Sequence, residues 1–185
     1  MKELFSEFGE GVLKFVDPAM ADNGVLYAGF TPEFAKTMGT LCAVADVIVP
    51  NMTEASFMLG LEYKEEYDEA YVKDVLNRLC DLGAKKAIIT GVAHKKGKLG
   101  TMGYDPEKNE YFEHYNDALP VKYHGTGDVY SSVCLGGLVN GMSLLDAASL
   151  AADFTVLSME KTLADKGSAW YGVNFEEAIP FLIKK

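Results

Sequence analysis

Two glycines flank a threonine directly ahead of an expected helix, in the run Gly125-Thr126-Gly127-Asp128. Glycines at such a place let backbone N–H groups converge on one point, and the partial positive charge of the helix start favours an anion there. Asp128 could then act as a general base, taking a proton from a hydroxyl group while the amides hold the developing negative charge. An acid in the first turn of a helix also interacts favourably with the helix dipole alone, and both interpretations stay open.

Polar residues follow three of the expected strands. Asp17 and Asp22 follow the first, Asn51 and Glu54 follow the second, and Thr90 lies at the end of the third. In a sheet of alternating strands and helices, ligands bind beyond the carboxyl ends of the strands. Each residue alone is more often a turn or cap residue than a ligand. Together they gather acids at one edge of the sheet, and such a cluster usually requires a cation or a phosphate group as partner.

The spacing of apolar residues predicts the elements that position these groups. Short apolar runs alternate with helical patterns, which is typical of an α/β protein. The expected strands span 12–16, 46–49 and 87–90, and an antiparallel hairpin pairs 99–104 with 110–115. The expected helices follow Thr31, span 53–59, pass through 72–79, begin near Asp128 and follow Ser143.

The helix after Thr31 has the clearest start and an expected buried face. Thr31 is a typical N-cap, and Pro32 and Glu33 suit a first turn. The buried stripe predicted from apolar residues at helical spacing comprises Phe34, Met38, Leu41 and Ala45.

Composition excludes several classes of protein. The 185 residues suit one domain, and 17 Lys and Arg against 27 Asp and Glu give a net charge of −10, which disfavours nucleic acid or an anionic membrane as partner. No apolar run is long enough to span a bilayer, and the acidic start is unlike a signal peptide. Cys42, Cys80 and Cys134 are too far apart for a metal motif and suit buried thiols in a reducing cytoplasm.

Three motifs resemble those of the ribokinase-like superfamily. They are Gly125-Thr126-Gly127-Asp128, Asn51-Met52-Thr53-Glu54 and Asp17-Pro18-Ala19-Met20-Ala21-Asp22-Asn23-Gly24. The first two are shared with sugar and hydroxymethylpyrimidine kinases, whereas the third points more narrowly to the pyridoxal/pyridoxamine (vitamin B6) kinase branch. The resemblance runs from about residue 10 to the C-terminus. The common phosphate-binding loops G-x-x-x-x-G-K-[ST] and G-x-G-x-x-G do not occur, so a nucleotide would require this other cradle.

The resemblance implies a three-layer α/β/α sandwich with a mostly parallel sheet, and transfer of a phosphoryl group from MgATP to the hydroxymethyl group of a B6 vitamer. Asp128 would be the catalytic base, and Gly125, Thr126 and Gly127 would form the anion hole. The residues implied to bind Mg²⁺, its waters or the ATP phosphates are Asp17, Asp22, Asn51, Glu54 and Thr90. The resemblance also allows a monovalent cation.

The chain departs from the resemblance at its front. Family members have several strands and helices before the strand that ends at Asp17, so residues 1–185 are expected to form a single truncated ribokinase-like domain equivalent to the C-terminal two-thirds. An uncovered sheet edge invites pairing, which predicts a homodimer or higher oligomer that covers the missing region.

Three functions remain open. The first is a B6 vitamer kinase, or the ATP-binding half of one. The second is a non-catalytic remnant that binds nucleotide or serves as an assembly partner, because a vitamer pocket without its N-terminal walls binds weakly and admits water. The third is a hydroxymethylpyrimidine kinase or another small-molecule kinase of the superfamily.

Overall fold

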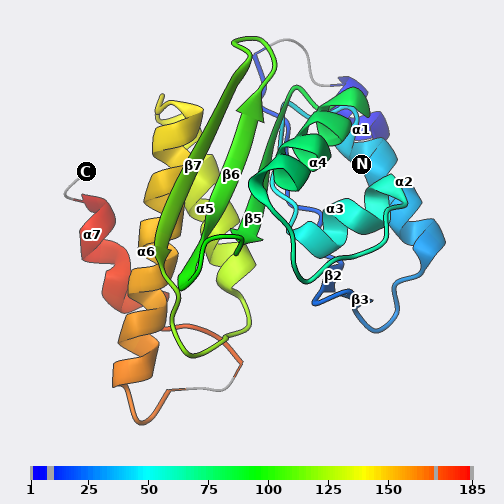
Figure 1. Ribbon diagram of the computed structural model, residues 1–185. Coiled ribbons are helices and arrows are strands. Elements are labelled where there is room, and N and C mark those ends of the chain that lie inside the picture. Colours follow the sequence, from blue (N-terminus) through cyan, green and yellow to red (C-terminus); the bar gives the residue numbers. More distant parts are fainter. Residues whose placement is uncertain (1, 8–10, 169–170, 184–185) are drawn as a thin grey trace. The chain divides into compact units, whose positions relative to one another are not determined.

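A five-stranded sheet organises the chain in the computed structural model, which describes residues 2–7, 11–168 and 171–183 (Figure 1). Its strands, in spatial order, are β1 (Phe15–Val16), β4 (Val47–Ile48), β5 (Lys86–Val92), β6 (Lys98–Asp105) and β7 (Glu110–Asp117). β1 pairs with β4 and β4 with β5 in parallel, with Val16 opposite Ile48 and Ile48 opposite Ala87. The expected mainly parallel α/β fold is therefore confirmed.

The long strands β6 and β7 form the predicted hairpin, joined by a turn at 106–109 in which Asn109 has φ 53°. The two strands approach closely at glycines. A Cβ atom on Gly103 would overlap the Phe112 ring, and one on Gly100 would overlap the backbone of His114. Small residues on β6 therefore make room for β7 and its side chains.

Gly103→Ala should lower the free energy of unfolding by about 1–3 kcal/mol, because the added methyl group forces the Phe112 ring to move. Gly136→Ala is the matched control. Gly136 is exposed within a helix and has open space at its Cβ, so alanine there should leave stability unchanged or raise it by about 0.5–1 kcal/mol. Urea denaturation of the two variants measures both effects, and equal stabilities would contradict the prediction.

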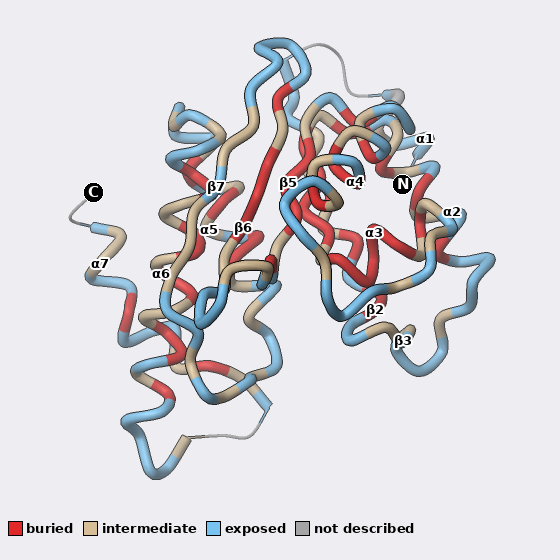
Figure 2. Tube along the Cα trace, viewed as in Figure 1, coloured by how far each residue is buried: buried red, intermediate tan, exposed pale blue. Residues whose placement is uncertain are grey.

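The chain divides into two compact units. The first comprises residues 1–94 and 101–113, and the second comprises 95–100 and 114–185. The helices of the first unit are α1 (Lys2–Glu7), α2 (Pro32–Cys42), α3 (Met52–Leu59) and α4 (Glu69–Asp81). A small antiparallel sheet, β2 (Ala21–Asp22) with β3 (Val25–Leu26), also belongs to it. Its core is fully buried at Ile48, Leu76, Leu79, Ile88 and Ile89, and Figure 2 shows the buried course of β5.

The predicted buried stripe of α2 is wrong. Its members were Phe34, Met38, Leu41 and Ala45, and only Ala45, beyond the end of the helix, is fully buried. The buried residues of α2 are instead Ala35, Gly39 and Cys42. A Cβ atom on Gly39 would lie 3.7 Å from Met58 Cβ, so α2 approaches α3 through its small side chains. Phe34 is left 37% exposed and packs against Phe30 with ring centroids 4.5 Å apart.

The second unit is built on α5 (Thr126–Val139) and α6 (Leu144–Ala164), followed by the 3₁₀ helix η1 (Phe175–Ala178) and α7 (Ile179–Ile183). Small residues also mediate this packing. A Cβ atom on Gly137 of α5 would lie 3.1 Å from the Ala147 Cβ of α6. Ser143 caps α6 by accepting the Asp146 N–H at 3.1 Å, as predicted.

Other predicted features agree with the structure in part. The first strand occupies Phe15–Val16 rather than 12–16, and β5 continues to Val92 rather than ending at Thr90. Cys42 and Cys134 are buried thiols, whereas Cys80 is partly exposed. Within the described residues, no helix is both long and apolar enough to cross a membrane.

Candidate active site

Polar residues gather at the carboxyl edge of β1, β4 and β5 in the first unit. Asp17 directly follows β1, and Asn51 comes three residues after the end of β4. Asn51 forms a parallel bridge to Thr90, next to the 3.0 Å hydrogen bond that the Thr90 N–H donates to the Pro50 carbonyl. Parallel pairing thus brings residues from separate strands to one edge, as the sequence predicted.

Asn51 and Glu54 begin α3 with a complete capping box. The Glu54 N–H donates to Asn51 Oδ1 at 2.9 Å, and the Asn51 N–H donates to Glu54 Oε2 at 2.8 Å. Asn51 Nδ2 also donates to the Ala21 carbonyl at 2.8 Å, which ties the β2–β3 hairpin to the helix. Asn51 and Glu54 therefore stabilise the start of a helix, which is the usual role of such residues after a strand, in addition to any role in binding.

The Glu54 carboxylate is buried, with only 3% of the residue exposed. Burial raises its pKa from an ordinary 4.5 to about 7, and the nearby Asp17 carboxylate pushes the pKa in the same direction. Backbone N–H groups of Asn51 and Met20, the latter at 3.0 Å, oppose that rise by stabilising the charged form. We call Asp17, Asn51, Glu54 and Thr90 the acid cluster; two of its members are carboxylates, of which Glu54 is buried and Asp17 is partly exposed.

Asp22 differs from Glu54 in its exposure. It is exposed on β2, and its two carboxylate oxygens accept the backbone N–H and the side-chain amide of Asn23 at 2.9 and 2.7 Å. Asn23 and Gly24 form the turn of the hairpin with φ 49° and 77°. This Asn-Gly pair is a common two-residue hairpin signal, so the β2–β3 hairpin was predictable from the sequence.

The glycine turn, Gly125–Asp128, begins α5 in the second unit. Gly125 is the N-cap with φ 81°, a left-handed conformation that favours glycine, and it offers no side chain to cap the helix. Added Cβ atoms at Gly125 and Gly127 would meet nothing within 4 Å. Both glycines are exposed, and no neighbouring atom occupies the positions where their side chains would begin.

Two side chains flank these glycines. The Thr126 hydroxyl donates to the Tyr123 carbonyl at 3.4 Å, and Asp128 lies exposed in the first turn of α5. Exposed backbone amides with a carboxylate beside them can bind an anion and accept a proton from a hydroxyl group at the same place.

Two contacts in the first unit were missed from the sequence. The Met20 N–H that bonds Glu54 and the Thr53 hydroxyl that accepts the Gly24 N–H at 3.0 Å connect residues about thirty positions apart. A backbone N–H has no sequence signal, because every residue other than proline carries one.

Comparison with known proteins places the chain among kinases. The family model described as phosphomethylpyrimidine kinase matches residues 11–170. The pyridoxine kinase of Bacillus subtilis is 29% identical over 153 residues, which cover 80% of this chain and 54% of that protein. The hydroxymethylpyrimidine/phosphomethylpyrimidine kinase of Aquifex aeolicus is 33% identical over 146 residues, which cover 78% and 52%. The chain therefore spans about half the length of the curated relatives it matches.

A solved structure is also similar. A Bacteroides thetaiotaomicron protein assigned as a phosphomethylpyrimidine kinase, crystallised with pyridoxal, has a TM-score of 0.92 and 32% identity, covering 98% of this chain and 65% of that one. The family model covers most of the chain, and the fold agrees with it. The resemblance noted in the sequence is confirmed: the chain belongs to the phosphomethylpyrimidine kinase family, within the ribokinase-like proteins.

Proposed function

We propose that this chain carries the phosphoryl-transfer machinery of a kinase that moves the γ-phosphoryl group of ATP to the hydroxymethyl group of a vitamin B6 vitamer. The observation that carries the proposal is the start of α5, with its glycine N-cap and with Asp128 in the first turn. Phosphoryl transfer depends mainly on positioning and on neutralising charge, which is the chemistry that uncapped amides and an adjacent carboxylate can supply.

The roles in the glycine turn follow from its groups. Backbone N–H groups of Gly125, Thr126 and Gly127 donate to the oxygens of the transferred phosphoryl group. The Asp128 carboxylate takes the proton of the acceptor hydroxyl as its oxygen bonds to the γ-phosphorus. The bond from that phosphorus to the β–γ bridging oxygen breaks, and ADP leaves with the electron pair.

The acid cluster fits Mg²⁺, the ion that accompanies ATP in such transfers. The ion prefers hard oxygen ligands such as carboxylates, and Asp17 and Glu54 supply them, Glu54 from a buried position. The raised pKa of Glu54 is the mark of a buried carboxylate that a cation would stabilise. Asp22, Asn51 and Thr90 would hold the metal's waters or the ATP phosphates. Asp22 would first have to give up the two hydrogen bonds that its carboxylate accepts from Asn23.

Two relatives favour different acceptors. The Bacillus subtilis protein is a pyridoxine kinase and the Bacteroides protein was crystallised with pyridoxal, which support a B6 vitamer. The Aquifex aeolicus protein phosphorylates hydroxymethylpyrimidine by its name, and its 33% identity makes that acceptor the second candidate. The third candidate is a chain that binds nucleotide at the glycine turn without turnover.

Two measurements on the full chain separate these candidates. Calorimetry with MgATP tests nucleotide binding, and ADP release is followed with pyridoxal, pyridoxamine, pyridoxine and hydroxymethylpyrimidine as acceptors. Turnover with a pyridine acceptor supports the B6 kinase, and turnover with the pyrimidine alone supports the second candidate. Binding without turnover supports the third, and an absence of MgATP binding contradicts all three.

We also propose that residues 1–185 act as one kinase domain that assembles as a homodimer or higher oligomer. The family match runs through both compact units, which supports a single domain. β1 is a terminal strand of the sheet, and Val12 and Leu13 just before it are 47% and 37% exposed. An apolar edge of this kind favours pairing with a second chain. Size-exclusion chromatography with light scattering should give at least twice the monomer mass of 20.2 kDa; a stable monomer would refute this part.

A further inference from the structure

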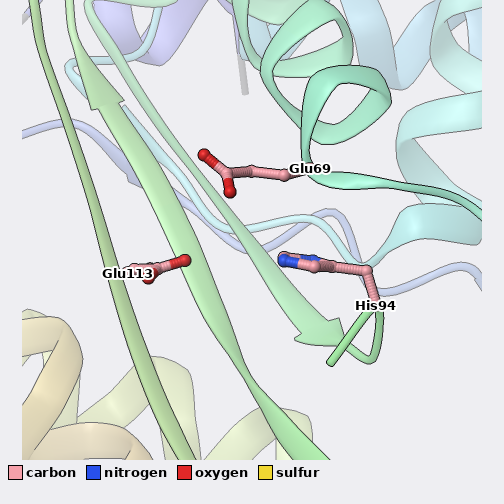
Figure 3. A group of neighbouring side chains, drawn as sticks. All are labelled: Glu69, His94 and Glu113. Atoms are coloured by element: carbon pink, nitrogen blue, oxygen red, sulfur yellow. The ribbon is translucent and has the colours of Figure 1, made fainter. Parts of the chain in front are cut away.

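Three side chains that could bind a metal ion lie close together in the first unit, and none of them belongs to the acid cluster. Glu69 is the first residue of α4, His94 lies just after β5, and Glu113 lies on β7. One ligand atom from each lies within 4.8 Å of the others. Figure 3 shows the His94 ring and the Glu113 carboxylate pointing toward one another, with the Glu69 carboxylate above the space between them.

Contacts outside the group hold its three segments in place. The Tyr67 hydroxyl accepts the Ala93 N–H at 3.2 Å, which ties the segment before α4 to the residue before His94. The Tyr111 hydroxyl donates to Asn77 of α4, which ties β7 to that helix two residues before Glu113. Hydrogen bonds between neighbouring residues therefore connect the three segments that carry the ligands.

Lys73 supplies positive charge beside the group. Its Nζ lies 2.6 Å from Glu69 Oε1 and 5.3 Å from the centroid of the Tyr111 ring. A hydrogen bond to Glu69, with further attraction from Glu69 and Glu113, raises the pKa of Lys73. The two glutamates already attract one cation, and a bound metal ion would compete with that ammonium group for Glu69.

We propose that Glu69, His94 and Glu113 form a surface site for a divalent first-row transition ion such as Zn²⁺. One imidazole nitrogen and two carboxylates suit an ion of borderline softness, and the imidazole disfavours Mg²⁺ and Ca²⁺. Three protein ligands leave a coordination position for water. The site would serve the stability or assembly of the first unit, since the proposed phosphoryl transfer uses other residues.

Calorimetry with Zn²⁺ on the untagged full chain tests the proposal. We expect saturable binding of one ion, weakened about 10-fold or more by His94→Asn and by Glu113→Gln. Lys73→Gln should tighten binding, because it removes the competing ammonium group from Glu69.

Two variants control for other zinc ligands. His124→Asn removes a histidine outside the group, and Cys80→Ser removes the partly exposed thiol. Both should bind Zn²⁺ as the wild type does, and circular dichroism checks that all variants are folded. No saturable binding up to about 1 mM Zn²⁺, or equal affinity in the wild type and His94→Asn, would overturn the proposal.

Discussion

Replacing Asp128 with asparagine should lower the turnover number for phosphoryl transfer by about 10²–10⁴-fold, the usual effect of losing a general base. The amide cannot accept the hydroxyl proton, although it keeps the size of the side chain. Because Asp128 is exposed in the first turn of α5, the substitution should leave the fold intact. Steady-state assays with the best acceptor measure the effect, and an unchanged rate would remove Asp128 from its proposed role.

The matched control for this variant is Asp146→Asn. Asp146 is also an exposed first-turn acid, in α6, where it accepts a hydrogen bond from the Ser143 hydroxyl at 2.7 Å. Each substitution should cost about 0.3–1 kcal/mol of stability through the helix dipole, but only Asp128→Asn should affect turnover. Asp128→Asn should bind MgATP at least as tightly as the wild type, because it removes a negative charge beside the phosphate site. Weakened binding would indicate a structural role instead.

The second large effect concerns the pH dependence of stability in metal-free protein. Glu54 has its pKa raised from 4.5 to about 7 in the folded chain, which corresponds to about 3 kcal/mol. Below pH 4.5 the carboxyl is protonated in both states and costs nothing. As pH rises toward 7 the unfolded chain releases this proton while the folded chain retains it, so the free energy of unfolding falls. Above pH 7 the loss is complete.

Urea denaturation at steps from pH 5 to pH 8 isolates this contribution when the wild type is compared with Glu54→Gln. Glutamine cannot ionise and keeps one oxygen acceptor for the backbone N–H groups, so the stability of the variant should vary less with pH, and the wild type should lose up to about 3 kcal/mol relative to it between pH 5 and pH 8. Groups other than Glu54 titrate in both proteins and cancel in the difference. Adding Mg²⁺ should restore wild-type stability near pH 8 more than that of the variant. Parallel pH profiles would contradict the burial argument.

The start of α3 shows which features can be predicted from residues close together in the sequence and which cannot. Asn51 and Glu54 are three residues apart, and that spacing alone places their side chains on each other's backbone N–H groups. The helix start and the family motif were therefore both predictable. The burial and the raised pKa of Glu54 were not, because they depend on the Met20 N–H, 34 residues away, and on Asp17.

The buried face of α2 is a feature that the apolar pattern of the sequence predicted incorrectly. Apolar spacing predicted Phe34 and Met38 as core residues, whereas the helix packs through Ala35 and Gly39. A hydrophobic pattern reports which residues could be buried, but the partner surface decides which are. Here α3 presents Met58, a large side chain, so α2 contributes small ones.

By itself the sequence determined the alternation of strands and helices, the glycine turn ahead of Asp128 and the membership of a kinase family, since each depends on residues that are neighbours along the chain or on a motif of fixed spacing. Only the tertiary structure decided the environment of Glu54 and the meeting of Glu69 with His94 and Glu113. Both features arise between segments that are distant in sequence. Such segments exclude water from one another or bring side chains to a common point, and a local sequence pattern predicts neither effect.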